Sequence, residues 1–133
     1  MGELGEFLGW LTGVCFAAAV LNYVVKRVNR RWIAPLPKES PVRRGYQPLM
    51  RLVVQYHRYF GVGAAVVAAS HLIMQIQWAF PSVTGIIAAS LLIVTAVLGS
   101  VLLCGHKRKL IVPHRIFAAA GFAAFVLHLL LKQ

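Results

Sequence analysis

The sequence predicts an all-α membrane protein, a single domain over residues 1–133 built as a transmembrane four-helix bundle. Of its 133 residues, 59% are hydrophobic and 13% are charged, and this charged share is about half that of a soluble domain. The mean hydropathy is +0.73. Four apolar segments each approach the length of about 20 residues that a helix needs to cross the hydrocarbon core. They cover about 4–25, 52–77, 84–104 and 114–131.

The connections between these segments carry most of the positive charge. The loop over 26–51 holds eight Lys and Arg residues and four prolines, so we expect it to be extended or irregular. The loop over 105–113 is also basic, whereas the connection at 78–83 is short and uncharged. The positive-inside rule places both basic loops in the cytoplasm and both termini outside the cell membrane. The second and fourth segments then both run from the cytoplasm outward.

The scarcity of acidic residues excludes several kinds of chemistry. Only Glu3, Glu6 and Glu39 are acidic, so paired-carboxylate catalysis and carboxylate-rich metal sites are nearly excluded. The net charge of +11 gathers in the loops, which indicates membrane topology and not nucleic-acid binding. Cys15 and Cys104 are expected at different depths, and no Cys-x-x-Cys-His motif occurs. Neither a disulfide nor covalently attached haem is therefore expected.

Four histidines in the second and fourth segments form two pairs with equal spacing. His57 and His71 are 14 residues apart, and so are His114 and His128. In a helix, 14 positions advance about 21 Å and return to within about 40° of the same face. Parallel helices would bring His57 opposite His114 at one depth and His71 opposite His128 at another. Two imidazoles facing each other are the axial ligands that a six-coordinate haem iron takes, which predicts two b haems.

In this prediction, the iron of an inner haem is bound by His57 and His114, and the iron of an outer haem by His71 and His128. A structural zinc site would instead bring four ligands together at one level. A single histidine in a membrane helix also has a simpler explanation as a hydrogen-bonding or packing group. The equal spacing of the two pairs is what favours haem.

An arginine follows each inner histidine. Arg58 follows His57 and Arg115 follows His114, and each His-Arg dipeptide belongs to a weak internal repeat. Because guanidinium pairs bidentately with carboxylate, Arg58 and Arg115 are candidates to bind the propionates of the inner haem. Snorkelling of these side chains to the cytoplasmic interface explains them equally well. His106, in the basic loop, is expected to be solvated.

The four-histidine pattern resembles that of membrane dihaem b cytochromes. Two families use it: the ferric-reductase-like transmembrane domain, which includes NADPH oxidases, and the four-helix haem core of quinol-oxidising cytochrome b. The resemblance covers mainly residues 57–71 and 114–128. It implies two stacked haems held between two parallel helices. The predicted direction of these helices favours the first family, although that family usually has six spans and no glycine-rich dinucleotide fingerprint is present here.

The expected function is transmembrane electron transfer through the two haems, and whether the chain is the membrane part of a reductase stays open. One alternative is a haem b quinone-reactive anchor subunit of a larger oxidoreductase, with Arg51, Gln55 and Tyr56 near an inner quinone. The other alternative is a haem-free four-helix membrane protein. At the outer haem, Gln75, Gln77 or Trp78 are candidate donors to the propionates.

The expected partners follow from the same function. They are the lipid bilayer and an electron donor and acceptor, each a protein or a quinone. The basic inner face is suited to an acidic cytoplasmic redox partner such as a ferredoxin, flavodoxin or flavoprotein. The same charges are also needed to set the topology of the helices.

Overall fold

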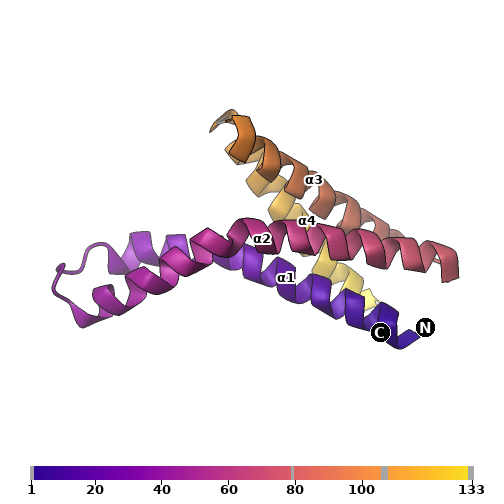
Figure 1. Cartoon of the computed structure of the whole chain (residues 1–133), viewed down its shortest axis with the longest axis horizontal. Helices are drawn as coiled ribbons and strands as arrows, with labels where there is room; N and C mark the ends of the chain where they lie inside the picture. Colours follow the sequence, from indigo (N-terminus) through magenta and orange to yellow (C-terminus); the bar gives the residue numbers. More distant parts are fainter. Residues whose placement is uncertain (1, 79, 106–107, 132–133) are drawn as a thin grey trace.

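The computed structural model describes residues 2–78, 80–105 and 108–131, and four long helices dominate it (Figure 1). Each long helix belongs to a segment that is long and apolar enough to cross a membrane. No strand occurs within the described ranges. The predicted all-α four-helix membrane architecture is therefore confirmed. In chain order, the elements are α1 (Gly2–Val28), η1 (Asn29–Ile33), α2 (Pro41–Trp78), α3 (Val83–Gly105), η2 (Arg108–Leu110) and α4 (Ile111–Leu131).

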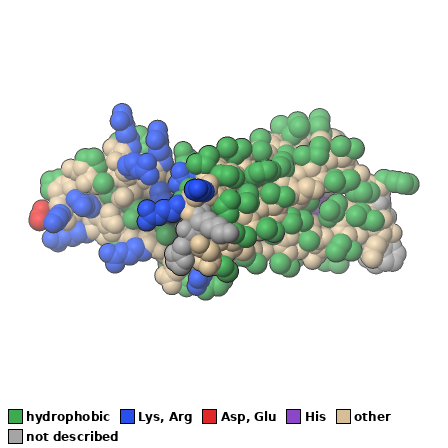
Figure 2. Space-filling view, turned by 90° about the horizontal axis from the view of Figure 1, so that it is seen from above, with side chains coloured by type: hydrophobic (Ala, Val, Ile, Leu, Met, Phe, Trp, Pro, Cys, Tyr) green, Lys and Arg blue, Asp and Glu red, His purple; other side chains and the backbone are tan. Residues whose placement is uncertain are grey.

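The surface of the bundle is apolar over most of its length. Large hydrophobic side chains stay exposed on every long helix, for example Phe7, Val66, Val97 and Leu130. Figure 2 shows these side chains over the body of the molecule and the Lys and Arg side chains gathered toward one end. Such a surface is stable against lipid chains and not against water, so the helices are suited to contact a bilayer.

The helices form two antiparallel hairpins. α1 packs along α2, α3 packs along α4, and α2 also contacts α3. α2 and α4 lie diagonally across the bundle, with no Cα pair of their described residues within 8 Å. Each is the second arm of its hairpin, so both run toward the same end, where α1 begins and α4 ends (Figure 1). The two histidine-bearing helices thus run toward the same end, and Figure 1 shows them crossing at an angle.

A small core lies between the two histidine levels. Phe16 of α1 is only 3% exposed and packs against Ala64, Ala68 and Leu92. The phenyl ring of Phe16 meets that of Phe125 edge-on, with ring centroids 6.4 Å apart. Alanines let the backbones of α1 and α2 approach closely, as small residues commonly do in membrane helices. This layer fills the middle of the bundle and leaves the space at the outer end to the second histidine pair.

The connection between α1 and α2 differs from the expectation of an extended or irregular loop over 26–51. Helical backbone continues through η1 to Ile33, and α2 already begins at Pro41, so only residues 34–40 form the turn. Pro41 is tolerated because the N–H groups of the first helical turn need no partner within the helix. We call residues 26–51 the basic hairpin.

Side-chain hydrogen bonds join the two arms of the basic hairpin. The Tyr46 hydroxyl donates to the Val25 carbonyl at 2.9 Å, and the Gln47 side-chain amide donates to the Asn29 side-chain oxygen at 3.1 Å. The Arg43 guanidinium donates to a carbonyl of the turn, that of Leu36, at 2.6 Å. These contacts between distant residues explain why the prolines did not make the segment irregular. The expectation of an irregular loop was wrong because it rested on the prolines and took no account of contacts between the two arms.

Two smaller differences concern the end of the second hairpin. α4 begins at Ile111, three residues before the predicted start of its span, and the 3₁₀ turn η2 precedes it. Pro113 is accommodated within the first turn of α4. His106 lies outside the described residues.

Candidate functional site

The inner histidines face each other from α2 and α4. His57 of α2 and His114 of α4 are half-buried, and their ring centroids are 6.3 Å apart with an angle of 85° between the ring planes. These are two residues that the equal spacing predicted to lie opposite each other. The two imidazoles therefore approach each other although no Cα pair of the described residues of α2 and α4 lies within 8 Å.

A main-chain carbonyl orients each inner imidazole. His57 Nδ1 lies 2.9 Å from the Ala19 carbonyl oxygen of α1, and His114 Nδ1 lies 3.0 Å from the Thr95 carbonyl oxygen of α3. A carbonyl oxygen can only accept a hydrogen bond, so Nδ1 donates in both cases. In the neutral ring, Nε2 then keeps its lone pair, and this is the tautomer in which Nε2 ligates a metal.

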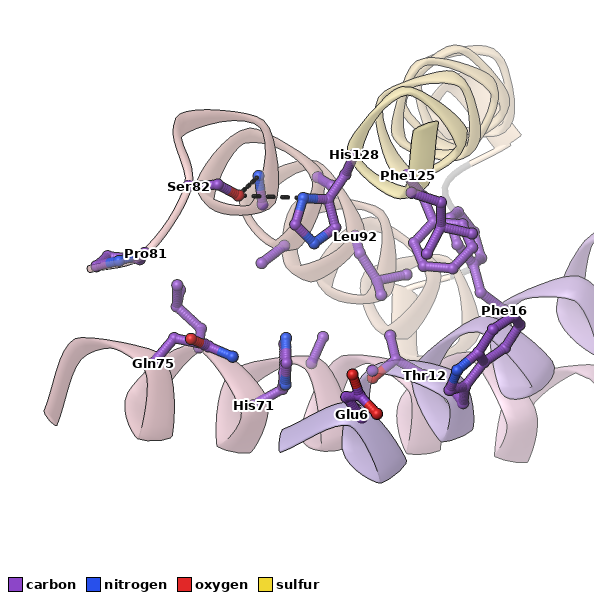
Figure 3. Close-up of a pocket in the computed structure, with 18 of the residues that line it drawn as sticks. Glu6, Thr12, Phe16, His71, Gln75, Pro81, Ser82, Leu92, Phe125 and His128 are labelled. Atoms are coloured by element: carbon purple, nitrogen blue, oxygen red, sulfur yellow. Dashed lines mark hydrogen bonds between the residues drawn. The ribbon is translucent and has the colours of Figure 1, made fainter. Parts of the chain in front are cut away.

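The outer histidines line a pocket of about 700 Å³ between the two hairpins. Figure 3 shows His71 on α2 and His128 on α4 pointing into this pocket from opposite sides. His128 Nδ1 lies 3.1 Å from the Ser82 hydroxyl and 3.2 Å from the Thr84 hydroxyl, at the start of α3. The His128 ring is thus held by hydroxyl groups, whereas the rings of His57 and His114 are held by carbonyls.

Most of the pocket wall is apolar, and all four long helices contribute to it. Besides the two histidines, it is lined by Glu6, Gly9, Trp10, Thr12, Phe16, Ala68, Leu72, Gln75, Phe80, Pro81, Ser82, Gly85, Ala88, Ala89, Leu92, Phe125, Val126, Leu129 and Leu130. The places of Glu6 and Ser82 in this wall could not be predicted from the histidine spacing, because neither residue lies on a histidine-bearing helix. Gln75, a candidate donor to the outer haem, lines the pocket, whereas Gln77 is exposed and the side chain of Trp78 lies outside the described residues.

Glycines lie beside three of the histidines, and two of these glycines leave room that the imidazole ring needs. A Cβ atom on Gly85 would lie 3.1 Å from Cε1 of His128, and one on Gly99 would lie 3.2 Å from Cε1 of His114. A Cβ atom on Gly9 would lie 3.6 Å from Cε1 of His71. Any larger residue at 85 or 99 would press on an imidazole. Neither glycine was predicted to belong to the site. Their spacing of 14 residues equals that of the histidines, and this equality could have indicated them.

The two hairpins hold their inner histidines in the same way. In each, the first helix supplies the carbonyl and the second helix supplies the imidazole. The sequence separation between carbonyl and histidine is 38 residues in the first hairpin and 19 in the second. The weak repeat around the His-Arg dipeptides therefore extends to a repeat of structure. The first hairpin differs by 19 additional residues between the matched positions, and they lie in its basic end.

The two arginine candidates have different surroundings. Arg58 lies over the Tyr59 ring, with its guanidinium carbon 4.6 Å from the ring centroid, and donates to the Tyr59 hydroxyl at 2.6 Å on an exposed surface. Arg115 is also exposed.

The candidate quinone residues are not brought together. Arg51 lines a second hollow of about 400 Å³, where Lys26 and Arg30 are also found. Gln55 and Tyr56 are exposed and do not line this hollow. Arg51, Gln55 and Tyr56 therefore do not line one common hollow among the described residues.

The imidazoles are the side chains that could hold a cofactor. Within residues 2–78, 80–105 and 108–131, no group of three or more His, Cys, Asp and Glu side chains could hold a metal ion. These ranges offer one imidazole pair at the inner level and two imidazoles that line the outer pocket.

The fold and these residues define a class: a four-helix membrane protein with histidine pairs at two depths. Comparisons with protein family models, curated proteins and solved structures find no match for this chain. Its function is therefore argued from its own residues.

Proposed function

We propose that the chain is a dihaem b cytochrome that carries electrons across the cell membrane. His57 and His114 would ligate the iron of the inner haem, and His71 and His128 that of the outer haem. The observation that carries the proposal is the 6.3 Å between the ring centroids of the inner pair. With bonds of about 2.0 Å to the metal and about 1.1 Å from nitrogen to ring centre, two imidazoles on opposite sides of one iron have centroids about 6.2 Å apart.

The hydrogen bonds of the inner imidazoles support the same proposal. Both rings donate from Nδ1 to a carbonyl of a neighbouring helix, so both present Nε2 as a potential ligand. A pair of histidines that merely packed together would not need both tautomers fixed.

The outer pocket supports the second haem. Its volume of about 700 Å³ lies within the range of about 300–1,000 Å³ that is usual for cofactor-sized ligands. Its apolar wall suits a flat macrocycle, and imidazoles enter from two sides (Figure 3). Haem supplies reversible one-electron chemistry when bound, and its potential depends on axial ligands, burial and hydrogen bonding. The protein's part is to orient the imidazoles and to keep water out with layers such as that around Phe16.

The orientation in the membrane is part of the proposal. The basic ends of both hairpins would lie in the cytoplasm by the positive-inside rule, and both termini would lie outside. The inner histidines would then be nearer the cytoplasm. The same arrangement of four histidines in ferric-reductase-like domains and in cytochrome b supports this role for the parallel helices α2 and α4.

The test is haem quantitation on the purified chain. We expect two haem b per chain, a Soret band, a sharp α-band on reduction with dithionite, and two transitions in a redox titration. A protein without a Soret band would support the haem-free alternative and end the proposal. Two haems together with a tightly co-purifying flavin or iron–sulfur subunit would instead support the quinone-reactive anchor.

A further inference from the structure

We propose that the basic hairpin is the docking surface for an acidic, soluble electron-carrier protein. This inference rests on the proposed function, because it names the partner that exchanges electrons with the inner haem. The surface is formed by the ends of α1 and α2 with η1 between them. Its cations are Lys26, Arg27, Arg30, Arg31, Lys38, Arg43, Arg44 and Arg51.

The basic hairpin is not needed to hold the histidines. The second hairpin makes the same carbonyl–imidazole bond with a sequence separation of 19 residues, whereas the first uses 38. Topology does not require all of its charge either, because the second hairpin reverses direction through a short connection that carries only a few cations, among them Arg108 and Lys109. The two hairpins can therefore be compared within one chain. The first has 19 additional residues at its basic end, which we call the extension, and the second lacks them.

The basic end of the first hairpin is longer than a crossing of the membrane requires. α2 has 38 residues, which corresponds to about 57 Å of helix, whereas the hydrocarbon core is about 30 Å thick. α3 has 23 residues and lacks such an excess. The outer end of α2 joins α3 through a short turn, so the excess lies at the basic end (Figure 1). We call the turn over 34–40 and the first turn of α2 the tip of the basic hairpin. Charges at the tip are thus more than one Debye length, about 8 Å, from the lipid headgroups.

The charge of the extension is almost purely positive. Among residues 26–51, Glu39 is the only acidic residue against eight cations, and seven of the eight are exposed. Figure 2 shows these cations gathered at one end of the molecule. Cations at the membrane boundary would attract anionic lipids, but those at the tip, such as Lys38 and Arg44, are too distant for that. A protein in solution with an acidic surface is the partner that fits their position.

The extension is an ordered structure. The side chains of Tyr46 and Gln47 donate hydrogen bonds to the opposite arm, and Arg43 donates one to the turn. Ile33, at the end of η1, is buried. A topological signal needs only charge, without a fixed shape. A docking surface gains from fixed shape, because less conformational entropy is lost on binding.

Three arginines of α2 lead from the tip toward the inner histidines. Arg44, Arg51 and Arg58 are spaced by seven residues, so they lie on one face of the helix about 10 Å apart. All three are exposed, and the last is adjacent to His57 in sequence. An acidic partner that follows this row would be guided toward the level of the inner haem.

The experiment uses the full chain in nanodiscs of phosphatidylcholine and photoreduced flavodoxin, an acidic one-electron carrier, as the probe. The test variant is Lys38→Gln with Arg44→Gln at the tip. The matched control is Arg108→Gln with Lys109→Gln, which removes the same charge from the second hairpin. We expect the bimolecular rate of haem reduction to fall with ionic strength in the wild type. At low salt, the tip variant should be about tenfold slower and the control within about twofold.

Equal effects of the two variants would overturn the inference, because net charge alone would then explain the rate. A rate of haem reduction that does not change with ionic strength would overturn it too. The inference would also be overturned if the tip variant no longer retained phosphatidylglycerol but reacted with flavodoxin at the wild-type rate. Binding of oxidised flavodoxin is measured in parallel and does not need haem. Haem content and reduction by dithionite report the proposed function separately, so the two failures are distinguishable.

Discussion

Replacing Gly99 by alanine tests how His114 is held. The new Cβ atom would lie 3.2 Å from Cε1 and 3.6 Å from Nδ1 of that ring. Favourable carbon–carbon contacts begin at about 3.5 Å, so the ring and α3 must separate by about 0.3 Å. Thr95 lies one turn away on α3, so the same movement stretches its 3.0 Å hydrogen bond with His114. The substitution therefore acts on ring orientation as well as on packing.

Two opposing energies set the size of this effect. Alanine is favoured over glycine in a helix interior by about 1 kcal/mol. Overpacking a close contact costs about 1–3 kcal/mol. Gly63 of α2 isolates the first effect, because a Cβ atom there meets no atom within 4 Å. We expect Gly63→Ala to be neutral or stabilising and Gly99→Ala to be destabilised relative to it by about 1–3 kcal/mol.

The assay combines thermal unfolding with low-temperature spectra of the reduced protein. Gly99→Ala should broaden or shift the α-band and change the midpoint potential of one haem, and leave the other unchanged. Gly63→Ala should change neither band. If Gly99→Ala matched Gly63→Ala in both stability and spectra, His114 would not be held against α3, and the account of the inner site would be refuted.

Three further substitutions separate the parts of the site. His57→Ala and His71→Ala should each lose about one of two haems, with different midpoint potentials remaining, and two haems retained in either variant would contradict the assigned ligands. Ser82→Ala should move the potential of the outer haem alone, because its hydroxyl lies 3.1 Å from His128 Nδ1, while Ser82→Thr should restore it. Tyr46→Phe should weaken the basic hairpin by about 1 kcal/mol, seen as faster amide exchange confined to that hairpin with unchanged haem content.

The sequence could predict the fold and the inner histidine pair because both depend on local regularities. The length of an apolar segment predicts a span, and the 3.6-residue period fixes where residues 14 apart lie on it. Loop charge then predicts the common direction of the second and fourth segments. From these three facts, His57 could be placed opposite His114 without any knowledge of packing.

The contacts between helices could not be predicted, because the sequence does not give the rotation of one helix against another. The carbonyl of Ala19, the hydroxyl of Ser82 and the niche at Gly99 all depend on that rotation. The basic hairpin was missed for a related reason, since Tyr46 and Val25 stabilise it across 21 residues of sequence. The sequence shows that Arg58 is adjacent to His57. It does not show that the Arg58 guanidinium lies over the Tyr59 ring on an exposed surface.

The repeated hairpin gives a reason for four spans. Two helices suffice to carry the four histidines, but a lone parallel pair could not fix both rings at the inner level. Ala19 and Thr95, on α1 and α3, supply the carbonyls that do so, and Gly85 and Gly99 supply the space beside the rings of α4. α1 and α3 therefore set the tautomer and orientation that the proposed ligation would need. The 19 additional residues of the first hairpin lie outside this requirement, which is why a separate role is assigned to the basic hairpin.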